Sequence, residues 1–183
     1  MDRAQRIVAL IGLRASGKST IARALAQRLG RAFVDLDDEL VRLAESDSIG
    51  RGSASAGELL AQLGEPAFRD LEERALARVL DSGVPCVVAT GGGVVERASN
   101  RERLARDTVC VWLVVSVAEL ARRMRASSIV RPSLTGRDPT LEIEEIERRR
   151  RAWYADLAHL RLECDALPED AIVRRIEERL AAP

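Results

Sequence analysis

The chain has 183 residues, enough to bury a hydrophobic core, and this length favours a single α/β domain. Its 29 Lys and Arg residues balance 29 Asp and Glu residues, so no overall basic surface indicates binding to nucleic acid or to an anionic membrane. Three cysteines without a C-x-x-C spacing, no secretory signal and no bilayer-length apolar run lead us to expect a cytoplasmic protein.

The first predicted element is a short buried strand, residues 7–11, which leads into the segment 12–20. This segment has the pattern G-x-x-x-x-G-K-[ST] of a phosphate-binding loop, or P-loop, and the apolar spacing over 21–29 predicts a helix after it. Backbone N–H groups in such a loop point at an anion, Lys18 reaches the β- and γ-phosphates, and the Ser19 hydroxyl is placed to bind Mg²⁺. The alternative, a glycine-containing turn that only joins strand to helix, does not explain the full pattern in this context.

Acidic residues follow a second short strand, predicted at residues 33–34. Asp35 and Asp37 fall at the carboxyl end of this strand, where open α/β sheets bind ligands, and they share one side if the strand stays extended. Asp38 and Glu39 are expected to cap or open the next helix. The alternative is that all four acids, Asp37 included, are helix-start residues.

Residues 51–81 are predicted to be mostly helical. Ser55-Ala56-Gly57-Glu58 forms a capping-box pattern, Gly64 is expected to end one helix, and Pro66 suits the first turn of the next. Arg69 lies near the start of this second helix, a position that the helix dipole disfavours unless an anion shares the site. Arg69 is therefore either an anion ligand or an ion-pair partner of a glutamate one turn further on, and both interpretations stay open.

A third strand is predicted over residues 86–90, and it runs into Gly91-Gly92-Gly93. Three glycines at the end of a strand let the backbone approach a ligand closely, which we favour over a flexible turn. A short helix over 99–106 and a strongly apolar strand over 109–115 follow, and we expect this strand in the interior of the sheet.

After a helix over about 117–125 the pattern breaks into a polar loop, about 126–140, with two prolines and a glycine. In a phosphate-binding protein such a loop, which carries Arg131, is a candidate lid, although a plain surface connection is the alternative. A long helix over 141–158 contains four consecutive arginines, 148–151, of which at most two can face one site.

An edge strand over 160–164 and a last helix opened by Pro168 complete the predicted elements. Strand and helix patterns alternate along the whole chain, with no internal repeat and no visible domain boundary. The sequence therefore predicts one domain, residues 1–183, built on a parallel sheet with helices on both faces.

These residues together suit the transfer of a phosphoryl group, which needs positioning and charge neutralisation more than covalent catalysis. Asp37 is placed to orient or deprotonate an acceptor hydroxyl, and Arg131 to bridge donor oxygens as charge develops. Arg69 and Arg150 remain to hold an anionic group, and arginine suits bidentate contacts with a carboxylate. The implied acceptor is a small hydroxylated carboxylate.

The chain resembles shikimate kinases over nearly its whole length. The P-loop alone is shared by many kinases, but the full set in this order is specific. The matching stretches are residues 12–20, Phe33-Val34-Asp35-Leu36-Asp37, Glu65 to Glu73 with Phe68-Arg69, Gly91-Gly92-Gly93, and Arg131-Pro132-Ser133-Leu134-Thr135-Gly136.

The resemblance implies a three-layer α/β/α fold whose five-stranded parallel sheet has the order 2-3-1-4-5. It also implies shikimate-binding helices over about 38–81 and a lid over about 126–140 that closes over ATP. The implied reaction is the ATP-dependent phosphorylation of the 3-hydroxyl of shikimate, a step of chorismate and aromatic amino acid biosynthesis. Mg²⁺ is the implied cofactor, ATP and shikimate are the implied partners, and a monomer is expected.

The resemblance also assigns roles to individual residues. It implies that ATP is bound by Ala15, Ser16, Gly17, Lys18, Ser19, Thr20, Arg125 and Arg131. It implies that shikimate is bound by Asp37, Arg69, Gly92, Gly93 and Arg150, that Mg²⁺ is held by Ser19 and Asp35, and that catalysis depends on Asp37, Lys18 and Arg131.

The sequence departs from the family pattern at three places. Ala15 stands where a third loop glycine is usual. The usual Arg-x-Pro-x-Tyr reads Arg150-Arg151-Ala152-Trp153-Tyr154, without the proline, so Arg151 stays an alternative to Arg150. The arginine near adenine is either Arg123 or Arg125.

The rival functions are another small-molecule kinase, such as a gluconate kinase, and a kinase-like domain that only senses a ligand.

Overall fold

A five-stranded, all-parallel sheet organises the computed structural model, which describes residues 7–126 and 139–182. Its strand order is β2-β3-β1-β4-β5, so the expected order 2-3-1-4-5 is confirmed. The strands are β1 (Ile7–Ile11), β2 (Ala32–Asp35), β3 (Cys86–Ala89), β4 (Thr108–Val114) and β5 (Leu160–Glu163).

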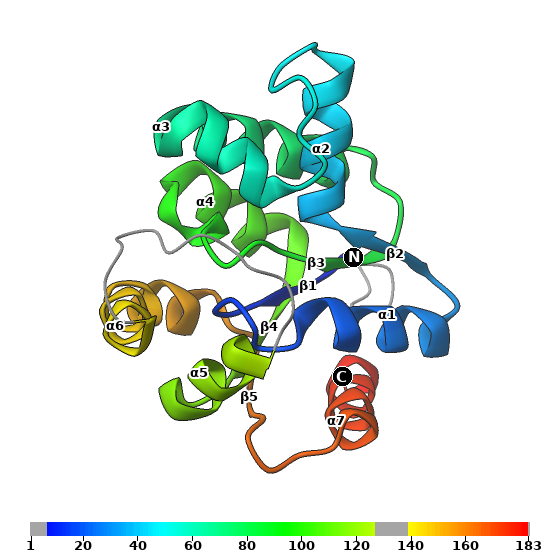
Figure 1. The fold of residues 1–183 in the computed structure, drawn as a ribbon. Coiled ribbons are helices and arrows are strands. Elements are labelled where there is room, and N and C mark those ends of the chain that lie inside the picture. Colours follow the sequence, from blue (N-terminus) through cyan, green and yellow to red (C-terminus); the bar gives the residue numbers. More distant parts are fainter. Residues whose placement is uncertain (1–6, 127–138, 183) are drawn as a thin grey trace.

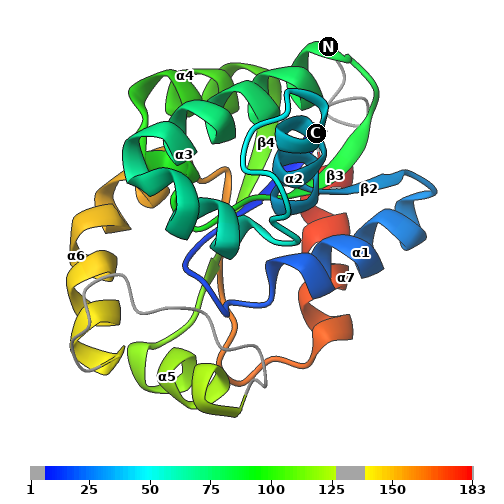
Figure 2. The same ribbon diagram turned by 45° about the horizontal axis from the view of Figure 1, so that its top comes forward.

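Helices cover both faces of this sheet, as a doubly wound parallel sheet requires. In Figures 1 and 2, α1 and α7 lie on one side of the strands, and α4 and α6 lie on the other. The helices are α1 (Lys18–Leu29), α2 (Leu36–Ser46), α3 (Ala56–Asp81), α4 (Ala98–Asp107), α5 (Val117–Ala126), α6 (Pro139–Leu157) and α7 (Glu169–Ala181), with a short 3₁₀ helix, η2 (Val94–Glu96), before α4.

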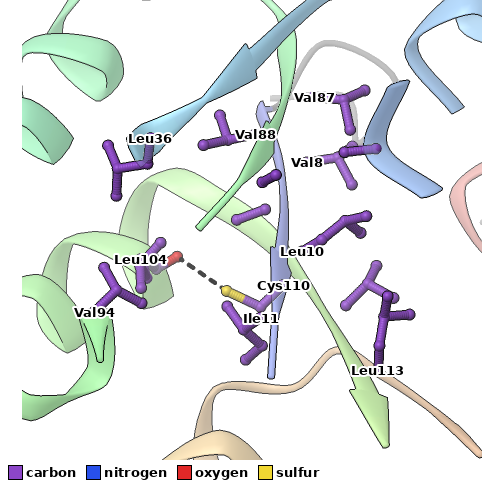
Figure 3. Packing of buried hydrophobic residues seen from close by; sticks show 14 of the residues in the cluster. Val8, Leu10, Ile11, Leu36, Val87, Val88, Val94, Leu104, Cys110 and Leu113 are labelled. Atoms are coloured by element: carbon purple, nitrogen blue, oxygen red, sulfur yellow. Dashed lines mark hydrogen bonds between the residues drawn. The ribbon is translucent and has the colours of Figure 1, made fainter. Parts of the chain in front are cut away.

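The core lies around the interior strands, where residues are buried on both sheet faces (Figure 3). All five residues of β1 are buried, and Val8 pairs with Val87 of β3 on one side and Val109 of β4 on the other. Burying one aliphatic side chain contributes about 1.5–3 kcal/mol, so the apolar runs that predicted β1 and β4 also stabilise them. β4 is an interior strand and β5 an edge strand, as expected.

The start of α2 corrects the expected position of Asp37. β2 ends at Asp35 and α2 begins at Leu36, so Asp37 lies in the first turn of a helix and not at the end of a strand. The cap is Asp35 rather than Asp38, because the Asp35 side chain accepts a hydrogen bond of 3.1 Å from the Asp37 N–H. That bond satisfies an N–H group that the helix leaves free, and acidic residues in the first turn match the helix dipole.

The predicted break near Gly64 is confirmed, because a kink at this residue divides α3, Ala56–Asp81, into two helical segments. Gly64 has φ 76° and ψ 163°, which no helix residue adopts, and Pro66 opens the second segment. At the N-terminus of α3, the Ser55 hydroxyl oxygen accepts a hydrogen bond of 3.2 Å from the Glu58 N–H, which confirms the predicted cap. Because the second helical segment begins after this kink, Arg69 lies near the N-terminus of that segment.

The predicted lid, about 126–140, falls almost entirely outside the described residues, and Arg131 lies outside them as well. None of the helices in residues 7–126 and 139–182 combines the length and the apolar character that a membrane-spanning helix needs.

Candidate functional site

The P-loop joins β1 to α1 in the conformation that an anion-binding loop requires. Gly12 and Gly17 have φ values of 140° and 94°, and a Cβ on Gly12 would lie 2.7 Å from the Leu113 carbonyl oxygen. Ala15 has φ 64°, a left-handed conformation that costs a residue with a Cβ roughly 1–2 kcal/mol. The departure at Ala15 therefore preserves the backbone path that glycine would take.

Lys18 folds back over this loop. Its side chain is buried, and Nζ donates a 2.7 Å hydrogen bond to the Leu13 carbonyl and a 3.4 Å bond to the Ser16 hydroxyl. The positive charge is thus placed above the turn whose backbone N–H groups precede the helix N-terminus. This arrangement concentrates positive potential at one point, as the binding of a polyphosphate requires.

Ser19 and Asp35 present two oxygen atoms to the same space. The Ser19 hydroxyl, in the first turn of α1, donates a 2.7 Å hydrogen bond to Asp35 Oδ2 at the end of β2. Mg²⁺ takes oxygen ligands, keeps several waters and is usually held by only one or two protein groups together with phosphate. A hydroxyl beside a carboxylate, at the mouth of the P-loop, fits that preference.

Each of the three consecutive glycines packs against a different part of the protein. A Cβ on Gly91 would lie 2.8 Å from Glu72 Oε1, one on Gly92 would lie 3.1 Å from a backbone nitrogen of the P-loop, and one on Gly93 would overlap the Arg69 guanidinium. Close packing is thus a third reason for glycine here, beside the ligand and the flexible turn that the sequence suggests. The glycine loop, residues 91–93, therefore brings the P-loop and α3 together.

Asp37 faces the same glycine loop from α2. Its side chain is half-buried, and Oδ1 lies 3.2 Å from the position that a Cβ on Gly91 would take. The structure therefore brings Asp37 next to the loop even though its place in the chain is a helix start.

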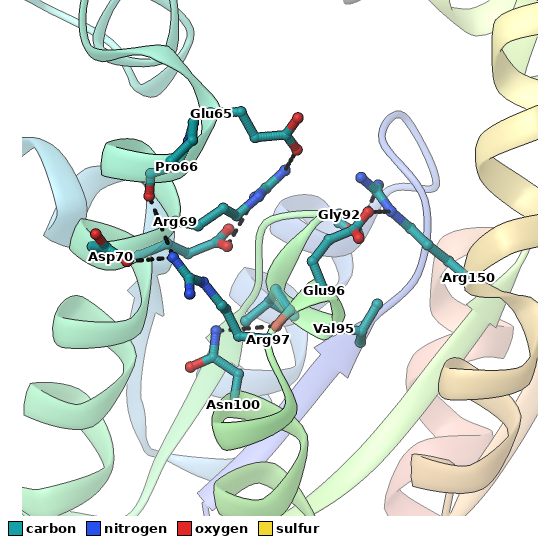
Figure 4. A network of polar contacts seen from close by, with 12 residues as sticks. Glu65, Pro66, Arg69, Asp70, Gly92, Val95, Glu96, Arg97, Asn100 and Arg150 are labelled. Atoms are coloured by element: carbon teal, nitrogen blue, oxygen red, sulfur yellow. Dashed lines mark hydrogen bonds and ion pairs between the residues drawn. The ribbon is translucent and has the colours of Figure 1, made fainter.

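Arg69 approaches the glycine loop from α3 and is itself buried (Figure 4). Nη1 donates to Glu72 at 2.8 Å and Nη2 to Glu65 at 3.3 Å, while Nε is buried without a hydrogen-bond partner among the described residues. Burial opposes the charge, but Glu72 and Glu65 outweigh it and raise the pKa of Arg69. Burial also raises the pKa of Glu72, against the opposing effect of Arg69. Arg69 is thus ion-paired, and it keeps an unsatisfied donor that suits an anion.

Arg150 reaches the loop from α6, on the other side from Arg69 (Figure 4). It is 5% exposed, and its guanidinium donates to Glu96 Oε1 at 2.7 Å and to the Gly92 carbonyl at 3.0 Å. Burial acts to raise the pKa of Glu96, but Arg150 and Arg149 outweigh it and lower that pKa. Arg151 is exposed and pairs with Glu147 along the helix, so Arg150 is the arginine that faces the glycine loop.

Arg123 of α5 lies against the P-loop. Its Nη1 donates to the Ala15 carbonyl at 3.4 Å, and its Nε is held by Glu119 at 2.7 Å. Arg125, which the sequence analysis assigned to ATP, is exposed. Of the two arginines left open, Arg123 is the one that the fold brings to the loop.

Three further residues belong to this site, although the sequence did not predict a site role for any of them. Glu96 holds Arg150, Tyr154 donates a hydrogen bond to the Gly92 carbonyl, and Glu72 fills the space beside Gly91. Glu72 carried a signal, since it lies three residues after Arg69 on one helix face. Tyr154 carried the signal of the Arg-x-Pro-x-Tyr pattern but no indication of its contact with Gly92, and Glu96 carried none, because their partners are more than 50 residues away in the chain.

Comparisons with known proteins agree with this geometry. The sequence profile of the shikimate kinase family matches residues 14–181. A shikimate kinase from Symbiobacterium thermophilum is 39% identical over 174 residues, covering 94% of this chain and 95% of the relative. One from Nitratidesulfovibrio vulgaris is 42% identical over 176 residues, covering 95% of each chain.

A solved structure agrees as well. The shikimate kinase from Acinetobacter baumannii in complex with shikimate superposes with a TM-score of 0.82 at 27% identity, covering 94% of this chain and 91% of that one. With a family profile that spans nearly the whole sequence and full-length relatives near 40% identity, the chain belongs to the shikimate kinase family.

Proposed function

We propose that this chain transfers the γ-phosphoryl group of ATP to the 3-hydroxyl of shikimate, and so supplies shikimate 3-phosphate to chorismate and aromatic amino acid biosynthesis. Its family membership makes it a kinase that acts on an alcohol group. The observation that carries the proposal is the glycine loop, which contacts the P-loop backbone at Gly92 and is flanked by Asp37, Arg69 and Arg150. One site thus joins a phosphate-binding end to a carboxylate-binding end.

At the donor end, residues 15–20 bind the ATP phosphates through backbone N–H groups, and Lys18 contacts the β- and γ-phosphates. Ser19 and Asp35 would hold Mg²⁺, Asp35 through water, and the bound ion supplies neutralisation of phosphate charge. Arg131, which lies outside the described residues, is proposed to contact ATP from the lid. Arg123 replaces Arg125 in our proposal as the arginine near the nucleotide, because of its contact with the P-loop.

At the acceptor end, Arg69 and Arg150 bind the shikimate carboxylate, and the Gly92-Gly93 backbone contacts the substrate. The 3-hydroxyl oxygen attacks the γ-phosphorus, the bond from that phosphorus to the β,γ-bridging oxygen breaks, and ADP leaves. Asp37 accepts the proton that the hydroxyl loses. The proposed enzyme acts as a monomer on two small molecules, with no nucleic acid or membrane partner.

A coupled assay for ADP release tests this function, with shikimate compared against gluconate and nucleoside monophosphates. We expect turnover with shikimate alone, and an Asp37→Asn variant that keeps its fold but loses most turnover. Turnover with gluconate instead would favour the other small-molecule kinase. Shikimate binding without any ADP release would favour a ligand sensor.

A further inference from the structure

Among residues 7–126 and 139–182, Tyr154 of α6 is the largest of the fully buried side chains, with 1% of its surface exposed. Its hydroxyl donates a hydrogen bond to the Gly92 carbonyl oxygen, which also accepts the 3.0 Å bond from Arg150. A carbonyl oxygen has two lone pairs, so these two donors use its full capacity. Two residues of one helix therefore hold one peptide group of the glycine loop.

The tyrosine ring is itself held in place. It stacks on Trp112 of β4 with ring centroids 5.7 Å apart and an interplanar angle of 28°. Burial raises the pKa of Tyr154 to about 12, so the hydroxyl stays protonated and remains a donor at any physiological pH. The phenol is thus a fixed hydrogen-bond donor on a rigid strand-and-helix support.

Fixing the Gly92 carbonyl also fixes the next N–H group. The described chain has no cis peptide bond, and in a trans peptide the C=O and N–H point to opposite sides of the chain. With the Gly92 carbonyl held toward α6, the Gly93 N–H is turned away from α6, and Figure 4 shows Arg69 on that other side. Glycine has the widest choice of backbone angles, so without restraint this peptide group is the most easily rotated part of the site.

We propose that Tyr154 is a positioning residue that locks the Gly92–Gly93 peptide and so aims the Gly93 N–H at the carboxylate of the acceptor. The inference rests on the proposed function, because it takes that carboxylate to lie between Arg69 and Arg150. Arg150 alone cannot serve this purpose, because its guanidinium is also required by the substrate. Tyr154 keeps the carbonyl bonded when Arg150 turns some of its donors to the ligand.

The test is Tyr154→Phe, which keeps the stacked ring and removes only the hydroxyl. We expect the KM for shikimate to rise roughly five- to tenfold, the effect of one lost hydrogen bond, with kcat and the KM for ATP changed by less than about twofold. The matched control is Trp153→Phe, at the preceding position of α6, where the ring packs against the Arg101 guanidinium. This control is expected to leave the KM for shikimate unchanged. A Tyr154→Phe variant that is less stable but has an unchanged KM would show a purely structural role and overturn the inference.

A second measurement keeps the hydroxyl of the side chain in place. Tyr154 is the only tyrosine in the chain, so growth on 3-fluorotyrosine labels this position alone. Saturating shikimate is expected to shift the fluorine resonance, because Arg150 turns some of its N–H donors from the Gly92 carbonyl to the substrate and the bond from Tyr154 changes in response. A resonance that does not shift when shikimate binds would contradict the inference. If the wild-type chain does not release ADP with shikimate, the proposed function fails and the inference with it. Turnover by the wild type combined with an unchanged KM in Tyr154→Phe rejects the positioning role alone.

Discussion

The donor end and the acceptor end of the site are built in different ways. The phosphate-binding part of the donor end is a single run of the chain, residues 12–20, and its lysine is held by the carbonyl of Leu13 within that run. The acceptor end is assembled from α2, α3, the glycine loop and α6, through the bonds of Arg69, Arg150 and Tyr154. The two ends meet at Gly92 and at the hydrogen bond from the Asp37 N–H to the Asp35 side chain, so we expect most substitutions to disturb catalysis and acceptor recognition separately.

The largest expected effect lies at the donor end. Lys18→Ala should lower kcat by about a thousandfold, because a charge aimed at the transferred phosphoryl group is lost. Calorimetry should find the binding of shikimate to the variant almost unchanged, since the Lys18 ammonium is bonded to the P-loop at Leu13 and Ser16. A comparable loss of shikimate binding would show that the two ends are not separable.

The next largest effect lies at the acceptor end. Arg150→Gln should raise the KM for shikimate by about a hundredfold, the effect of losing a charge-assisted hydrogen bond to a carboxylate. Steady-state kinetics should find the KM for ATP within about twofold of the wild type. Arg151→Gln is the matched control, because Arg151 is exposed and paired along the helix, and its KM for shikimate should stay the same. The reverse result would assign the carboxylate to Arg151.

A smaller effect is expected from the glycine loop. The Cβ added by Gly93→Ala overlaps the Arg69 guanidinium, which is the mobile end of a long side chain. Arg69 should therefore move while the fold persists, and the KM for shikimate should rise by about tenfold. Gly57→Ala in α3 is the control, because the nearest atom to its new Cβ is 3.9 Å away. Equal kinetics for both variants would remove Arg69 from the acceptor end.

The smallest effect concerns pH and stability rather than turnover. The pKa of Tyr154 is raised to about 12 in the folded protein, above its ordinary value of 10.0, so the protonated phenol stabilises the fold. This contribution is complete below pH 10 and is lost as the pH rises toward 12, at up to about 1.4 kcal/mol per pH unit. Ultraviolet titration of this single tyrosine should give a midpoint near 12. A midpoint near 10 would mean that the hydroxyl is not buried as the structure describes.

Much of the fold could be predicted from the sequence because it depends on local patterns. Runs of apolar residues predicted β1 and β4, and the backbone preferences of glycine and proline predicted the break at Gly64. The predicted start of α2 was wrong because acidic residues after a short strand are equally compatible with the end of that strand and with the cap of the next helix. Only the bond from Asp37 N–H to the Asp35 side chain decides between them.

The site could be predicted where its residues are consecutive in the sequence. It could be predicted less well where its residues come from separate helices. The P-loop appears whole in the sequence, and Arg69 signalled an anion or an ion pair through its position in the helix. The choice of Arg150 over Arg151, and of Arg123 over Arg125, depends on which face of a helix meets the rest of the fold. Neighbouring residues on a helix do not reveal that choice without the partner surface.

The most direct test of the central claim, that two arginines flank the glycine loop to hold a carboxylate, is to compare shikimate with its methyl ester as acceptors for the wild-type enzyme. The ester keeps the reacting hydroxyl, loses the negative charge and gains one methyl group. We expect kcat/KM to fall by about a hundredfold or more for the ester, because the guanidinium groups of Arg69 and Arg150 no longer meet a negatively charged group on the substrate. Equal kcat/KM values for acid and ester would contradict it.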